Sequence, residues 1–420
     1  MTEQMKPSGV VWMGDIPQNW NIKRVKYLAS LKGRIGWQGL TSDEYIDEGP
    51  YLITGIDFKD GGIDWDNCVH ISEKRWAEAP DIHIKNGDLL ITKDGTVGKV
   101  AIVSDLEGKA SLNSGVLLVR THEDYNKRFL FWVLQSEEFW TWFRLKNAGN
   151  STIIHLYQGD FAEFSYTFPE IGEQQQIAAF LNDQCTKIDG IIADIEKQIE
   201  TLQKYKKSVI SETLRKGTEK KVDLKDSDID IVGSVGKTWT IKRLKYLCKI
   251  QTGSQDTQDA VDEGHYPFYV RSPIVERIDK YVFDGEAVLM AGDGVGAGRI
   301  FHYVNDKFGC HQRVYIINSF KHVIGKFLYY YMQSFFSLEV EKGSAKSTVD
   351  SIRLPMLQNF LVCYPTIAEQ NNIVEYLDKK CADIDDVIST KEKQLDTIQQ
   401  HKKSLIYEYV TGKKRVTEVN

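Results

Sequence analysis

Two short segments hold the cationic side chains best suited to bind an anionic partner. Residues 22–26 read IKRVK and residues 241–245 read IKRLK, so the same cluster occurs twice. Lysine and arginine neutralise phosphate groups, and such contacts position a protein on a nucleic acid without selecting a sequence. A solvated helix face would carry the same charges, so both interpretations stay open. The candidate phosphate contacts are Lys23, Arg24, Lys26, Lys242, Arg243 and Lys245.

Two glycine turns could bring a basic side chain close to the bases of DNA. Asp94-Gly95 precedes Lys99, and Asp293-Gly294 precedes Arg299. Glycine lets a backbone approach its partner closely, and an arginine can donate two hydrogen bonds to one guanine. Two polar loops are further candidates for DNA contact, and they comprise Asn150, Ser151 and Thr152 in the first half and Lys346, Ser347 and Thr348 in the second.

The sequence offers no convincing catalytic, metal or cofactor site. Residues 292–297 fit a GxGxxA pattern, but the corresponding residues 94–99 do not, which favours a tight glycine turn over a dinucleotide site. Pro80-Asp81 with Glu107-Gly108-Lys109 matches a loose nuclease pattern that arises easily by chance and has no copy in the second half. Cys310-His311 lacks further ligands at zinc spacing. No tetrapeptide of the DPPY type, which serves methyl transfer to a base, occurs.

The composition predicts a multidomain protein of the cytoplasm. A chain of 420 residues with 42% hydrophobic residues can bury more than one core. The formal net charge of −6 gives no overall positive field, so DNA binding would need local basic surfaces or partner subunits. The six cysteines are scattered and predict reduced thiols. We expect no signal peptide and no membrane span, because no run approaches the roughly 20 apolar residues that a span needs.

The sequence repeats itself in a defined order. Residues 20–28 and 239–247 are identical at 7 of 9 positions, and residues 173–209 match 369–405 at 16 of 37. The stretches between these anchors diverge, although short matches keep the same order in both halves. The design is therefore a variable module, a helix, a second variable module and a second helix.

The second repeated segment has the spacing of a coiled-coil seam. Apolar residues recur at alternating intervals of four and three, and a lysine (Lys206 or Lys402) interrupts each seam at the equivalent place. Each helix of about 42 residues would span on the order of 60 Å. We expect the two helices to pair antiparallel, as a spacer between modules related by a pseudo-dyad. The seam residues are Ile188, Ile192, Ile195, Ile199, Leu202 and Val209, and Ile384, Ile388, Leu395, Ile398, Leu405 and Tyr409.

Identities also extend to outward helix positions that the seam does not need. A helical hairpin that only stabilises the modules explains the seam but not these identities, which favour a surface used twice, for two copies of one partner. The candidate docking residues are Glu196, Lys197, Gln198 and Gln203, with Glu392, Lys393, Gln394 and Gln399.

The two modules contain short apolar runs separated by Gly, Asp and Asn, which predict α+β or α/β domains. We predict recognition domains at 1–168 and 238–364. The long helices are predicted at 169–216 and 365–412, the charged segment 217–237 as a linker, and 413–420 as a polar tail.

The pattern resembles the specificity subunits of type I restriction-modification enzymes. The resemblance spans essentially the whole chain and lies in residues 14–20 (GDIPQNW), in 23–28 (KRVKYL) and in the Pro-x-Ile-x-Glu-Gln-x-x-Ile signatures at 169–177 and 365–373. The second half departs from the family pattern at one turn, where Gly236 replaces the proline found at position 17.

The resemblance implies two target-recognition domains that each read one half of a split DNA site. The helices would act as a spacer and as the docking surface for two modification subunits that bind S-adenosylmethionine and methylate adenine. Separate restriction subunits would supply ATP- and Mg-dependent translocation and cleavage, so this chain would be no enzyme and hold no cofactor or metal.

Two other classes of protein remain as alternatives. A single-chain nuclease or methylase lacks its cofactor motifs here. A stand-alone bivalent DNA-binding regulator would not need the outward identities on the helices.

Overall fold

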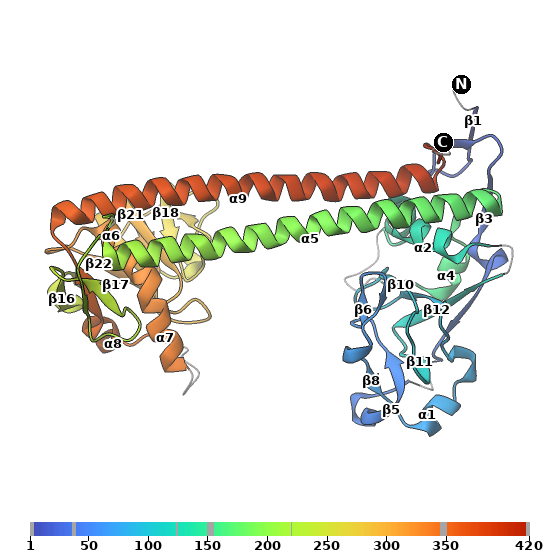
Figure 1. The fold of residues 1–420 in the computed structure, drawn as a ribbon, viewed down its shortest axis with the longest axis horizontal. Helices are drawn as coiled ribbons and strands as arrows, with labels where there is room; N and C mark the ends of the chain where they lie inside the picture. The colour runs from blue at the N-terminus through green and yellow to red at the C-terminus, as the bar shows by residue number, and fades with distance from the viewer. Residues whose placement is uncertain are drawn as a thin grey trace. The chain divides into compact units, whose positions relative to one another are not determined.

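The computed structural model describes residues 4–35, 39–122, 125–148, 155–219, 221–344 and 351–416. The chain divides into two compact units, each described by itself. The first combines residues 1–195 with 394–420, and the second comprises residues 196–393. There are two long helices, α5 (Ile171–Lys216) and α9 (Ile367–Val410) (Figure 1). Part of each helix belongs to the first unit and the rest of it to the second.

The module of the first unit is built on a buried four-stranded antiparallel sheet with the order β10-β9-β12-β4. One face of this sheet, which includes Leu89 and Leu117, packs on helices α2 and α3 and on the start of α5. The other face, which includes Leu90 and Leu118, packs on a smaller sheet of order β11-β5-β8. Burial on both faces explains why β9, β10 and most of β12 are apolar without alternation, whereas the edge strand β4 alternates. The strands are β1 (Met5–Pro7), β2 (Asp15–Pro17), β3 (Asn21–Arg24), β4 (Ala29–Gly33), β5 (Ile46–Ile53), β6 (Phe58–Lys59), β7 (Gly62–Ile63), β8 (Val69–His70), β9 (Leu89–Thr92), β10 (Val100–Ile102), β11 (Ala110–Leu112), β12 (Val116–Thr121) and β13 (Ser165–Phe168), and the short helices are α1 (Glu73–Ala77), α2 (Lys127–Gln135), α3 (Glu137–Lys146) and α4 (Gln158–Ala162).

The module of the second unit repeats this plan in a six-stranded sheet of order β17-β22-β20-β21-β18-β19. Val288 and Ile317 face the helices, whereas Leu289 and Ile316 face the opposite side. Both modules are therefore α+β, with mainly antiparallel pairing. The strands are β14 (Leu224–Asp226), β15 (Ser234–Gly236), β16 (Thr240–Arg243), β17 (Lys249–Thr252), β18 (Tyr266–Tyr269), β19 (Glu276–Ile278), β20 (Phe283–Ala291), β21 (Phe301–Cys310), β22 (Val314–Asn318) and β23 (Leu361–Tyr364), and the short helices are α6 (Gly325–Tyr331), α7 (Ser337–Ser344) and α8 (Leu354–Asn359).

The predicted seam is confirmed, and its two lysines have a defined place. Within the first unit the Nζ of Lys402 lies 2.5 Å from the carboxylate of Asp189, and within the second Lys206 lies 2.6 Å from Asp385. In the first unit α5 contacts α9 at Phe180 with Tyr409 and at Asp189 with Lys402, so the contacts advance along α5 while they go back along α9. In the second unit they pass from Lys206 with Asp385 to Gly217, just after α5, which lies close to Glu369. The two helices therefore pack antiparallel in each unit. The lysines bond to the other helix rather than simply interrupting the seam, which suits a role in fixing its register.

The repeated Pro-x-Ile-x-Glu-Gln signature forms the joint between each module and its long helix. In the first unit Trp20 donates to Glu173 at 2.9 Å. The buried amide of Gln174 donates to the Pro169 carbonyl at 2.8 Å and accepts from the backbone of Asn126, the N-cap of α2, at 3.0 Å.

The second unit repeats every one of these bonds. Trp239 donates to Glu369 at 3.1 Å. Gln370 donates to the Pro365 carbonyl at 2.9 Å and accepts from the backbone of Ile324, the N-cap of α6, at 2.9 Å. The repeat found in the sequence is therefore a repeat of hydrogen bonds that fix a module helix, and the tryptophan just before β3 or β16, to the long helix. We call these two sets of bonds the joints.

The prediction of a linker at 217–237 is wrong. β14 and β15 pair antiparallel within this segment, and Val232 and Val235 are buried in the core of the second unit. The charged residues at 219–230 resemble a solvated connection, but the apolar side chains that follow them belong to the module. The described part of the predicted tail is also packed, because Lys413 donates to the carbonyl oxygens of Met13 and Asp15 at 3.0 and 3.1 Å.

Replacing either joint glutamine by leucine should destabilise its own unit. Gln174→Leu leaves the buried Pro169 carbonyl and the partly buried Asn126 N–H without this partner, at up to about 1–3 kcal/mol for each group. Gln370→Leu should do the same in the second unit, whereas Gln175→Leu at an exposed position should be nearly neutral. Thermal unfolding of the three variants measures this. Equal midpoints for Gln174→Leu and Gln175→Leu would show that the joint does not stabilise its unit.

Candidate nucleic-acid interface

The two basic clusters lie at matching places in the two units. Lys23 and Arg24 are on β3 and Lys26 is in the 3-10 turn Val25–Tyr27, and their copies lie on β16 and in the turn Leu244–Tyr246. β3 pairs with β13 in the same way as β16 pairs with β23. A helix face as the alternative explanation is therefore wrong, because the clusters stand on a strand and a turn. Exposed Tyr27 and Tyr246 follow at the same position of each turn.

The two clusters differ in how far they are neutralised. In the first unit Glu163 bonds to both Arg24 and Lys26, at 2.8 and 2.6 Å. The hydrogen bond with Lys26 lowers the pKa of Glu163 and raises the pKa of Lys26, so both stay charged. In the second unit Asn359 takes the place of Glu163 and accepts from Arg243 at 3.4 Å. Within the described residues the second cluster thus has no carboxylate partner.

Both Asp-Gly turns lie within hairpin connections, at residues 93–99 and 292–300. The first joins β9 to β10 and the second joins β20 to β21, which confirms a turn rather than a dinucleotide site at 292–297. Gly95 and Gly294 have φ of +68° and +71°, a conformation that glycine adopts freely. Gly98 is required for another reason, because a Cβ there would lie 2.4 Å from the ring of Trp140.

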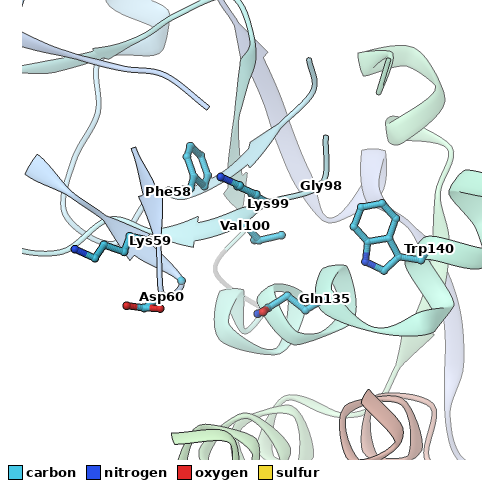
Figure 2. Close-up of a pocket in the computed structure, with 9 residues that line it drawn as sticks. Phe58, Lys59, Asp60, Gly98, Lys99, Val100, Gln135 and Trp140 are labelled. Carbon is cyan, nitrogen blue, oxygen red and sulfur yellow. The ribbon is translucent and has the colours of Figure 1, made fainter. Parts of the chain in front are cut away.

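Lys99 and Arg299 occupy different surroundings. Lys99 lines a hollow of about 310 Å³ together with Lys59, Gln135 and Trp140 (Figure 2), and its Nζ lies 3.4 Å from the carbonyl oxygen of Gly55. Arg299 is exposed at the edge of a larger hollow of about 590 Å³ and forms no ion pair within the part of the chain that the structure describes.

The aspartates of these turns bind basic side chains that the sequence did not single out. Asp94 lies 2.5 Å from the Nδ1 of His155. Asp293 bonds to Arg271 at 3.1 Å and to Arg313 at 3.4 Å. These partners stand 20 to 61 residues away along the chain, and no local spacing marks them. The alignment of Asp94 with Asp293 was the only signal that pointed here.

Other predicted residues are placed as follows. All eight docking residues on α5 and α9 are exposed, as outward positions require. Asn150, Ser151, Thr152, Lys346, Ser347 and Thr348 lie outside the described residues. No group of three or more His, Cys, Asp or Glu side chains arranged to hold a metal ion occurs in the described ranges. None of the described helices is both long and apolar enough to cross a membrane.

The residues of the loose nuclease pattern bond elsewhere. Asp81 pairs with Lys32 at 3.3 Å, and Lys109 pairs with Glu73 at 2.8 Å. Cys310 is buried in the core beside β22, and burial raises the pKa of its thiol to about 12, which suits a structural thiol.

The family model for the type I restriction modification DNA specificity domain matches this chain twice, at residues 17–201 and 236–400. The chain belongs to the type I restriction-modification specificity subunits. Each match covers one module with most of the long helix that follows it. The two joints and the two basic clusters thus lie within the repeated specificity domain.

Two relatives are specificity subunits of type I restriction enzymes. Over 437 residues, 96% of this chain and 95% of the relative, the chain is 26% identical to the type I restriction enzyme MjaVIII specificity subunit of Methanocaldococcus jannaschii. It is 33% identical over 168 residues to the EcoDI specificity subunit of Escherichia coli, covering 40% of this chain and 36% of that one.

The fold is shared with solved chains at low identity. A chain from a study of complex assembly and conformational transition of the type I R-M system matches with a TM-score of 0.71 at 16% identity, over 95% of this chain and 99% of that one. The HsdS subunit from Thermoanaerobacter tengcongensis matches with a TM-score of 0.50 at 14% identity, over 95% and 98%.

The unequal neutralisation of the two basic clusters should be visible in the salt dependence of DNA binding by this specificity subunit. Glu163→Asn should free Arg24 and Lys26 and steepen the slope of log K against log salt by about 1 for each new phosphate contact. Asn359→Glu should make the slope shallower. Binding titrations of the full chain at several salt concentrations measure both, with Asp81→Asn as a control for lost charge elsewhere. Identical slopes in all variants would assign the clusters to solvated surface.

Proposed function

We propose that this specificity subunit reads an asymmetric, bipartite DNA site, with one block for each module and an unread spacer between them. The proposal rests on one contrast: the bonds of the joints are the same in both modules, whereas the residues on the exposed turns differ. The same hydrogen bonds attach both modules to a long helix, while the turns that face solvent carry different side chains. A duplicated frame with divergent surfaces suits two independent readings of one duplex.

The two basic clusters would hold the sugar-phosphate backbone beside each block. Phosphates are alike on both half-sites, so a cluster repeated almost unchanged fits them. The turns at Asp94 and Asp293, whose neighbours differ between modules, would face the bases.

The long helices would dock two modification subunits. Supporting this are the exposed identities on both helices, at Glu196, Lys197, Gln198 and Gln203 and at Glu392, Lys393, Gln394 and Gln399. Packing between α5 and α9 does not require identity at exposed positions. We place S-adenosylmethionine in these partners, ATP and Mg in restriction subunits, and the whole assembly in the cytoplasm.

Under this proposal the chain selects the site and its partners perform the chemistry. The purified chain should transfer no methyl group and cut no DNA, with or without S-adenosylmethionine, Mg and ATP. Methyl transfer should appear when modification subunits are added, and the mass of the complex should correspond to two of them per chain. Radiolabelled methyl transfer and native mass spectrometry test both points. Robust methylation or cleavage by the chain alone would instead support a single-chain enzyme, and failure to bind any modification subunit would support a stand-alone regulator.

A further inference from the structure

The Asp-Gly turn occupies the same place in both modules. The residue just before the aspartate, Lys93 or Gly292, makes two backbone hydrogen bonds that recur in both modules, which fixes the correspondence of residues without relying on sequence identity. In the first module Lys93 N–H donates to Gly115 O (2.8 Å), and Lys93 O accepts from Leu156 N–H (2.9 Å). In the second module Gly292 N–H donates to Arg313 O (2.8 Å), and Gly292 O accepts from Ile352 N–H (2.7 Å). Arg313 therefore stands where the first module has Gly115, and Ser351 stands where it has His155.

A second correspondence comes from the parallel strand pairs. β5 pairs with β11 so that Ile53 lies opposite Leu112, and β18 pairs with β21 so that Tyr269 lies opposite Cys310. Ile53 and Tyr269 are the last residues of their strands. Two residues beyond these ends stand Gly55 in the first module and Arg271 in the second. Both arginines that bond to Asp293 thus replace glycines.

The aspartate is common to both modules, and only its partners change. Asp293 forms an ion pair with Arg271 through Oδ1 and with Arg313 through Oδ2. Asp94 has glycines at those two places and bonds to His155 instead. One carboxylate at one position of the frame therefore presents two arginines in one module and a histidine in the other.

The exposure of these groups does not suit a merely structural ion pair. The side chain of Asp293 is 16% exposed, whereas those of Arg271 and Arg313 are 45% and 63% exposed. Ion pairs that are open to solvent add little to stability. One carboxylate cannot neutralise two guanidinium groups, so the cluster of Asp293 with its two arginines keeps a net positive charge, although Glu276 also lines the adjacent hollow. Holding the guanidinium groups in place lowers the entropy that they lose when they bind a ligand.

The surroundings suit the edge of a base. Arg271 and Arg299 line the same hollow of about 590 Å³, beside the tip of the turn. At that tip Val295 is 97% exposed and offers an apolar surface, such as a thymine methyl group contacts. The arginine fork matches the O6 and N7 acceptors of guanine, which are exposed in the major groove.

We propose that Arg271 and Arg313 read guanine in the half-site of the second module, and that Asp293 is the positioning residue that orients them. Asp94 orients His155 in the same way in the first module, so the identity of the residue bonded to this aspartate sets which base each module prefers. The proposal rests on the proposed function, because it assigns base readers within a sequence-specific DNA-binding chain.

The test uses the chain in complex with its modification subunits and begins with the sites that the wild-type complex methylates. The block read by the second module should contain guanine, and replacing that guanine by 7-deazaguanine, which lacks the N7 acceptor, should weaken binding. Arg271→Lys and Arg313→Lys keep the charge but lose the fork, so selectivity for that guanine should fall about fivefold or more while the first block stays unchanged. Asp293→Asn should reduce selectivity for the same guanine, and His155→Ala should change base selectivity only in the block read by the first module.

Controls separate base reading from other causes. Lys307→Ala removes an exposed charge elsewhere in the second module and should leave the motif intact. Thermal unfolding shows whether each variant folds. If Arg271→Lys and Arg313→Lys weaken binding equally for every sequence, the arginines contact phosphate and the inference is wrong. It is also wrong if the wild-type complex is selective and neither variant changes the motif. A wild-type complex without any sequence preference would overturn the proposed function itself.

Discussion

A buried side-chain amide at the start of each long helix is the constraint on which the rest of the structure depends. Gln174 and Gln370 each bond to a proline carbonyl and to the backbone at the N-cap of a module helix. An amide buried among apolar side chains must satisfy both its donor and its acceptor, so it tolerates little displacement of its partners. The adjacent glutamates, bonded to Trp20 and Trp239, fix the entrance of the module in the same way. Each module is therefore attached to its helix at two points.

This constraint explains which parts of the chain repeat and which diverge. Residues of the joints and of the seam have partners inside a unit, so a change in a joint leaves polar groups unpaired and a change in the seam loses apolar packing. Turn residues face solvent and can change without loss of the frame. The contrast between Glu163 and Asn359, and between His155 and the pair Arg271 and Arg313, shows two modules of one plan with different surface chemistry.

The sequence predicted the features that follow from periodicity and repetition. The long helices were predictable because a stripe such as Ile188, Ile192 and Ile195 has the period of a coiled-coil seam and must pack against a partner. The doubled joint was visible as a doubled signature. The segment 217–237 was mistaken for a linker because charge dominates its composition, although Val232 and Val235 belong to the core. Partners such as Arg271 and Arg313 could not be predicted, since they meet Asp293 only through the pairing of strands distant in sequence.

The central claim is that one duplicated frame carries two independent readers of DNA. The most direct measurement is the set of bases modified in a cell that expresses the chain with its modification subunits, compared with a chain in which residues 29–168 come from a relative. We expect a bipartite motif in which the replacement changes one block and leaves the other block and the spacer length as they were. A replacement that changes both blocks, or a wild-type motif without an unread spacer, would contradict it.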